Sequence, residues 1–219
     1  MNGYRRAGVG QVGLRVEEVW KAYGRRQVLR GASLQVDAGA LVGVFGENGA
    51  GKSTLLKVIC GQLAPDAGRV LRGGQLGYCP QHVVLDERLT VAQHLRFFQV
   101  AYRLPGLQRA EELLDTLGCV RFRRDRVGVL SGGTRQKINL VLALMHDPPV
   151  LVLDEPYQGF DWDTYLRFWE LAGELRSRGR SVLMVSHLAH DLDRFDGVHQ
   201  LRDGRLEPFL AAAPDGEAR

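Results

Sequence analysis

The sequence has few cysteines, few lysines and no long hydrophobic run. Its three cysteines show no CxxC spacing, so we expect neither a disulfide framework nor a zinc site, and we expect a reducing compartment. The longest uninterrupted apolar segment covers residues 140–145, far short of the roughly 18 residues that a membrane-spanning helix needs. The net charge is only +4 over 219 residues. It does not indicate nucleic-acid binding, which requires basic residues gathered on one face.

What is present is the composition of an ordinary globular domain, with 45% hydrophobic and 25% charged residues. Alternating or fully apolar runs predict strands, and apolar residues at helical spacing predict helices. The predicted strands cover residues 14–19, 28–36, 40–45, 69–71, 75–79, 150–153 and 182–185, followed by a hairpin over 198–207. The predicted helices cover residues 52–60, 90–102, 110–117, 131–145 and 162–178. Because fully apolar strands are buried on both faces, the pattern predicts an α/β core with a parallel sheet.

A glycine-rich loop lies between a predicted strand and a predicted helix and matches the phosphate-loop pattern G-x-x-x-x-G-K-[ST]. Its glycines allow successive backbone N–H groups to point inward at a helix N-terminus and bind phosphate. Lys52 would reach the β- and γ-phosphates, and the hydroxyl of Ser53 would hold Mg²⁺. The expected nucleotide-binding residues here are Gly46, Glu47, Asn48, Gly49, Ala50, Gly51, Lys52, Ser53 and Thr54.

A pair of carboxylates follows the apolar strand at residues 150–153. Ligands of open α/β sheets bind at the carboxyl ends of the strands. Asp154 is therefore expected to bind Mg²⁺, and Glu155 to polarise the water that attacks the γ-phosphate.

A third motif, Leu-Ser-Gly-Gly-Thr-Arg-Gln at residues 130–136, begins a predicted helix and puts Ser131 23 residues before Asp154. It resembles the LSGGQ signature of ATP-binding cassette (ABC) ATPases. Physically it is a second anion site, because a serine N-cap and two glycines expose N–H groups at the positive end of a helix. The resemblance implies that this site completes the pocket of a second subunit through Ser131, Gly132, Gly133 and Gln136.

Four further positions match the family in order. The resemblance implies that Tyr23 stacks on adenine, that Gln81 contacts Mg²⁺ or water, that Asp161 belongs to the D-loop facing the partner subunit, and that His187 is the switch histidine. It thereby implies a catalytic set of Lys52, Gln81, Glu155 and His187, and a Mg²⁺ site formed by Ser53, Gln81 and Asp154. Two residues depart from the family pattern: Thr134 replaces the signature glutamine, and Phe160 replaces the D-loop leucine.

The resemblance implies one ABC ATPase domain over residues 14–207. We expect a P-loop NTPase core at 14–81 and 147–207 with an antiparallel β subdomain, an inserted α-helical signature subdomain at about 82–146, and flexible termini at 1–12 and 212–219. The implied function is ATP binding and hydrolysis in a homodimer or pseudo-dimer. This dimer would drive a transmembrane permease from the cytoplasmic face of the membrane, without a nucleic-acid partner.

Alternatives remain at this point. The segment after Leu89 looks most like exporter-type cassettes, and we expect no C-terminal regulatory domain of the kind carried by many sugar-importer subunits. A soluble ABC ATPase acting in assembly, translation or repair is the alternative function. Taken alone, the apolar residues Val83, Val84 and Leu85 and the stretch at 95–98 are typical of the core of the helical lobe. The resemblance implies that this region receives a short helix of the membrane partner, so we expect a shallow apolar groove near residues 82–98.

Overall fold

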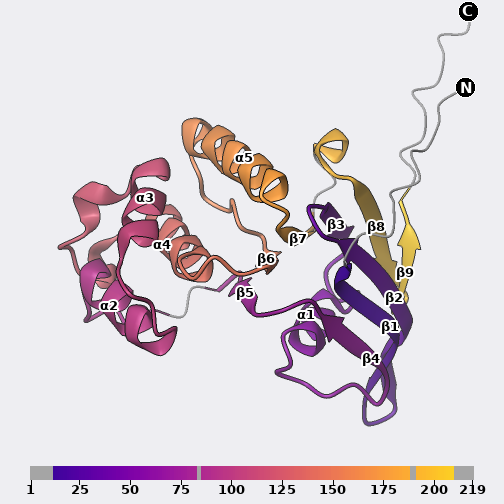
Figure 1. Cartoon of the computed structure of the whole chain (residues 1–219). Helices are drawn as coiled ribbons and strands as arrows, with labels where there is room; N and C mark the ends of the chain where they lie inside the picture. The colour runs from indigo at the N-terminus through magenta and orange to yellow at the C-terminus, as the bar shows by residue number, and fades with distance from the viewer. Residues whose placement is uncertain (1–11, 83–84, 188–190, 210–219) are drawn as a thin grey trace, which may run out of the picture.

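A computed structural model describes residues 12–82, 85–187 and 191–209. The termini expected to be flexible fall outside these ranges, except that Val12 already begins the first strand. Two sheets and a group of helices make up the described chain (Figure 1).

The smaller sheet is antiparallel and has three strands in the order β2-β1-β4: β1 (Val12–Tyr23), β2 (Arg26–Asp37) and β4 (Ala67–Arg72). Strand β1 runs further than the predicted 14–19. Its register shifts between Val16 and Val19, and Glu18 there has a left-handed φ of 46°. Such a bulge leaves an extra residue in one strand and interrupts the alternation on which the prediction depended.

The larger sheet has six strands in the order β5-β6-β7-β3-β8-β9. Neighbouring strands are parallel except for the β8–β9 hairpin. The strands are β3 (Leu41–Phe45), β5 (Leu76–Cys79), β6 (Val150–Asp154), β7 (Ser181–Ser186), β8 (Gly197–Arg202) and β9 (Arg205–Pro208).

Alternate residues of the central strands point into two separate cores. Val150 and Val152 pack with the antiparallel sheet and with α1 (Lys52–Ile59). Leu151 and Leu153 pack into the second core, which also contains α4 (Gly132–Leu144) and α5 (Trp162–Ser177). Both faces of the parallel sheet are thus covered, as the fully apolar strands predict.

The remaining helices are α2 (Val91–Ala101) and α3 (Gln108–Thr116), with short 3₁₀ turns η1 (Val120–Phe122), η2 (Val127–Val129) and η3 (Leu192–Arg194). Helices α2, α3 and α4 gather at one side of the molecule, away from the antiparallel sheet (Figure 1). A capping box at Thr90 starts α2, with Thr90 and Gln93 exchanging side-chain and backbone hydrogen bonds. The predicted fold class, an α/β P-loop core with an antiparallel β subdomain and a helical insertion, is confirmed. Within the described ranges, no helix is both long and apolar enough to span a bilayer.

Candidate functional site: a phosphate loop, a carboxylate pair and a separate signature face

The phosphate loop connects β3 to α1 and exposes backbone donors. Gly51 is the N-cap of α1 and has a φ of 109°, and no side chain caps this helix. The positive φ requires glycine, and a Cβ here would lie 3.2 Å from the carbonyl oxygen of Val28. The Lys52 ammonium donates to the carbonyl oxygens of Gly46 and Glu47, which holds it over the loop. The uncapped helix N-terminus and this ammonium together form an anion site.

A cavity of about 430 Å³ lies beside this loop and gathers most of the predicted residues. Gly46, Glu47 and Ala50 do not line it; Glu47 and Ala50 instead line a neighbouring polar cavity with the β8–β9 turn. The sequence-predicted residues that line the first cavity are Tyr23, Asn48, Gly49, Gly51, Lys52, Ser53, Thr54, Gln81, Asp154, Glu155 and His187.

Two lining residues were not predicted from the sequence. Arg26 and Val28 follow Tyr23 across the first hairpin turn and face the same cavity. Tyr23 itself is 50% exposed at the end of β1, so its ring is free to pack against a planar ligand. Arg26 adds a positive charge at this edge. Its proximity depends on the hairpin register, which the sequence pattern does not fix.

Glu155 and His187 form a close pair at the ends of β6 and β7. The backbone N–H of His187 donates to Oε1 of Glu155 at 2.8 Å, and Nδ1 of the imidazole lies 2.6 Å from the same oxygen. Glu155 is only 6% exposed and has a left-handed φ of 50°. A strained backbone and two contacts on one oxygen fix the direction of this carboxylate.

Asp154 carries the strongest electrostatic perturbation of the site. Burial, and secondly the charge of Glu155, raise the pKa of Asp154 from 3.8 to about 6, against the opposing effect of a hydrogen bond from the backbone of Gln81. Asp154, the hydroxyl of Ser53 and the amide of Gln81 line the same cavity. Such hard oxygen ligands suit Mg²⁺. The charge of the ion would also offset the repulsion between the Asp154 and Glu155 carboxylates, so the residues present fit the ion.

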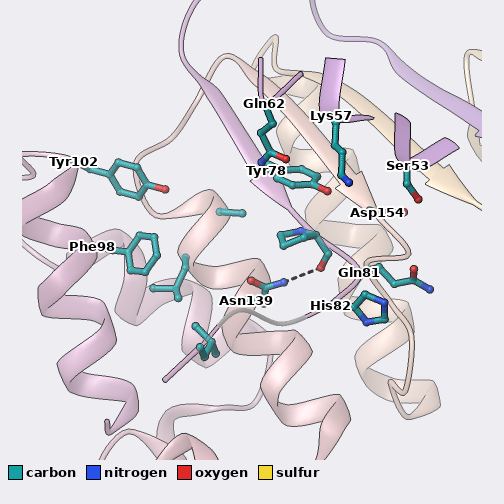
Figure 2. A pocket seen from close by; sticks show the side chains of 14 residues that line it. Ser53, Lys57, Gln62, Tyr78, Gln81, His82, Phe98, Tyr102, Asn139 and Asp154 are labelled. Carbon is teal, nitrogen blue, oxygen red and sulfur yellow. Dashed lines mark hydrogen bonds between the residues drawn. The ribbon is translucent and has the colours of Figure 1, made fainter. Parts of the chain in front are cut away.

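The loop that carries Gln81 is anchored from the helical side. The side-chain amide of Asn139 on α4 donates to the carbonyl oxygen of Pro80 at 2.9 Å (Figure 2). Asn139 is only 7% exposed and Pro80 is partly buried, so this bond is largely shielded from solvent. It ties α4 to the segment that contacts Asp154.

The signature residues begin α4 as the sequence predicts. Ser131 is the N-cap, and its Oγ accepts from the backbone N–H of Thr134 at 3.2 Å and lies 2.9 Å from the Thr134 hydroxyl. Gly132 and Gly133 line a second cavity of about 440 Å³, separate from the phosphate-loop cavity. Gln136 also lines this signature cavity. It is 4% exposed, and its side-chain amide donates to the Glu155 carbonyl oxygen of the same chain at 3.5 Å.

The D-loop packs directly on the signature. A Cβ at Gly133 would lie 2.1 Å from the carbonyl oxygen of Gly159. Asp161 caps α5 by accepting from the Thr164 backbone, and it pairs with Lys137 at 3.1 Å. Phe160, the departure from the family pattern, packs against the core edge-on to Phe168. The signature and the D-loop therefore form one continuous face.

Comparison with known proteins agrees with this geometry. The family model described as "ABC transporter" matches residues 29–158, more than half of the chain. The chain is 30% identical to "ABC transporter G family member 20" of Dictyostelium discoideum, over 90% of this chain and 29% of the relative. It is 40% identical to "Zinc import ATP-binding protein ZnuC" of Paramagnetospirillum magneticum, over 81% of this chain and 68% of the relative.

A solved structure described as "Structure of ATP binding subunit of ABC transporter" superposes with a TM-score of 0.83 at 31% identity. It covers 88% of this chain, and the match covers 87% of that structure. The chain therefore belongs to the ABC transporter family, and it has the fold of that family's ATP-binding cassette.

Proposed function

We propose that this protein binds and hydrolyses Mg-ATP and that two copies, or this chain and a similar one, enclose the nucleotide between them. The observation that carries the proposal is the convergence of Lys52, Asp154, Glu155 and His187 on one cavity beside the phosphate loop. An ammonium, two carboxylates and an imidazole from three separate chain segments meet where a triphosphate would lie, and each has a role in phosphoryl transfer.

The residues divide the chemistry as follows. The loop amides and Lys52 bind the β- and γ-phosphates and stabilise the charge that develops on them. Glu155 orients the attacking water, and His187, already against Glu155, contacts the γ-phosphate. Ser53, Asp154 and Gln81 would hold Mg²⁺, which when bound neutralises phosphate charge. Tyr23 would stack on adenine, and Arg26 would supply a further positive charge.

The second subunit follows from the separation of the two anion sites. Ser131, Gly132 and Gly133 are absent from the lining of the phosphate-loop cavity among the described residues. A second copy can bring its own signature to this cavity, and Asp161 and its D-loop would then face the partner.

Replacing Glu155 tests the catalytic assignment. The Glu155→Gln variant keeps the shape of the side chain but not its charge, so ATP binding should persist and turnover should fall by about 10²-fold or more. Dimers should accumulate in Mg-ATP, as measured by size-exclusion chromatography with light scattering. Glu170→Gln, the same change on the exposed side of α5, is the control and should keep normal turnover. Unaltered turnover in Glu155→Gln would remove this residue from its role.

We further propose that the protein works on the inner face of a membrane and drives a separate transmembrane subunit. Support comes from a groove of about 550 Å³ between the core and the helices, lined by Leu85, Phe98 and Tyr102 together with polar groups such as Lys57 (Figure 2). Leu85 and Phe98 are partly buried in this groove, but Leu95 is fully buried in the core and does not contribute. The predicted groove residues Val83 and Val84 lie outside the described residues.

Purification from native membranes distinguishes the two candidate settings. Recovery of a polytopic membrane protein with this chain supports transport, whereas recovery of soluble proteins alone supports the non-transport alternative.

A further inference from the structure

Two tyrosines bracket the segment that carries His187. The hydroxyl groups of Tyr157 and Ser186 are hydrogen bonded to each other, directly before His187 in the chain. The hydroxyl of Tyr165 donates to Oδ2 of Asp191, four residues after His187. We call these four residues, Tyr157, Tyr165, Ser186 and Asp191, the tyrosine clasp. None of them belongs to the motifs that identify the site.

The backbone at Asp191 needs such an anchor. Asp191 has a φ of 52°, in the left-handed region that residues other than glycine rarely adopt. Its carboxylate accepts from Tyr165 and also from Nε of Arg194 at 3.2 Å. Burial raises the pKa of Tyr165 to about 12, so its hydroxyl keeps the proton that it donates. The clasp therefore adds two side-chain contacts that stabilise this sparsely populated conformation.

The two tyrosines are fixed by an aromatic cluster on α5. Their rings meet edge to face at 5.4 Å, and both contact Trp169. The guanidinium of Arg194 lies 5.0 Å from the centre of the Trp169 ring. Since closely packed rings have few alternative positions, the two hydroxyls are presented at fixed points.

The clasp lies next to the Glu155–His187 pair. The Glu155 backbone N–H donates to the carbonyl oxygen of Val185 at 2.9 Å, and the His187 backbone N–H donates back to the Glu155 side chain. Tyr157 lies two residues after Glu155 and bonds to Ser186 between these two contacts. The chain around Glu155 and the chain around His187 are thus joined at three successive points.

We propose that Tyr157 and Tyr165 are positioning residues that hold His187 against Glu155 during ATP hydrolysis. The inference rests on the proposed ATPase function. A general base and its partner lose efficiency steeply when misplaced by even 1 Å. Removing one clasp hydroxyl therefore slows the chemical step, whereas the phosphate loop that binds the nucleotide is untouched.

The test measures kcat and KM for Mg-ATP with the full chain. Tyr165→Phe keeps the ring packing and removes only the hydroxyl, and it should lower kcat about five- to tenfold with KM within twofold. Asp191→Ala should lower kcat by the same factor. Asp191→Asn should retain most of the wild-type kcat because an acceptor oxygen remains. The double variant with Tyr165→Phe and Asp191→Ala should have a kcat no lower than that of the slower single variant. Tyr157→Phe should behave like Tyr165→Phe.

Ser177→Ala is the matched control, since it also removes a hydroxyl hydrogen bond on α5, the one to the Glu174 carbonyl oxygen, but far along the helix from the clasp. It should leave kcat unchanged. A lowered melting temperature with unchanged kcat, a raised KM with unchanged kcat, or additive losses in the double variant would each overturn the positioning role. If the wild-type chain does not hydrolyse Mg-ATP, the proposed function is wrong. If the wild-type chain hydrolyses Mg-ATP and the clasp variants do so at the same rate, only the positioning role is wrong.

Discussion

Asp154 gives the sharpest test of the electrostatics, because the same substitution should act in opposite directions on stability and on activity. Its rise in pKa from 3.8 to about 6 corresponds to about 3 kcal/mol at 1.36 kcal/mol per pKa unit. Asp154 is half-buried, so solvent screening reduces this to about 1.5 kcal/mol. Above pH 6 the carboxylate is ionised in both the folded and the unfolded chain, and the folded state bears the full free-energy cost of burying this charge beside Glu155. Below about pH 4 the carboxyl group is neutral in both states, and the cost disappears.

Asp154→Asn should therefore raise the free energy of unfolding of the nucleotide-free protein by about 1.5 kcal/mol at pH 8. The gain should shrink between pH 6 and pH 4, and ATP turnover should be lost. Urea unfolding followed by far-UV circular dichroism at several pH values measures the first effect. Equal stabilisation at pH 4.5 and pH 8, or destabilisation at pH 8, would refute the reasoning.

Asp161→Asn is the matched control, because it makes the same change at an aspartate whose pKa is shifted the other way. Hydrogen bonds, first from the Thr164 backbone, hold the pKa of Asp161 well below its usual range. This carboxylate stabilises the folded state wherever it is ionised, and that contribution is lost as the pH falls. Asp161→Asn should lower stability at pH 8 by less than about 1 kcal/mol, since asparagine still caps a helix and only the exposed pair with Lys137 is lost.

Two more predictions concern the contacts that join the helices to the core. Gly133→Ala should destabilise the protein by about 1–3 kcal/mol and reduce turnover, because its Cβ would collide with the Gly159 carbonyl oxygen. Gly132→Ala is the control: its Cβ would meet open space, so it should leave the midpoint of thermal unfolding nearly unchanged. Equal destabilisation by the two substitutions would contradict the packing argument. Asn139→Ala leaves the Pro80 carbonyl oxygen without its buried donor. It should cost about 1–3 kcal/mol in urea unfolding and raise the Mg²⁺ concentration needed for half-maximal turnover; an unchanged Mg²⁺ requirement would show that this bond does not position the Gln81 loop.

The elements that carry the site could be predicted from the sequence because their signals are local. Ser131 is the N-cap of α4, as predicted, since a short polar side chain before a helical pattern favours an N-cap. The fully apolar runs that precede Asp154 and His187 became the central strands β6 and β7. The position of Asp154 and Glu155 at a strand end, and for His187 the resemblance to the ABC family, then predicted which flanking residues line the cavity.

Other features depend on tertiary register and could not be read from spacing. Arg26 reaches the cavity only because the hairpin pairs Tyr23 with Arg26. Gln136 lines the signature cavity, and its amide also contacts the Glu155 carbonyl oxygen of the same chain, which the signature pattern does not indicate. The bond between Tyr165 and Asp191 joins residues 26 positions apart, and no periodicity in either segment indicates it.

The separation of the two anion sites also explains how closure could be reported to the chemistry. Among the described residues, Gln81 is the one that lines both the phosphate-loop cavity and the signature cavity. Its loop is tied to α4 through Asn139 and Pro80, and α4 starts at the signature. If a second subunit's nucleotide binds at Gly132 and Gly133, as we propose, it acts on the N-terminus of α4, and this one helix connects it to the loop that carries Gln81 beside Asp154. We therefore expect occupancy of the signature cavity to change the position of Gln81 relative to Asp154, which would couple one pocket to the geometry of the other.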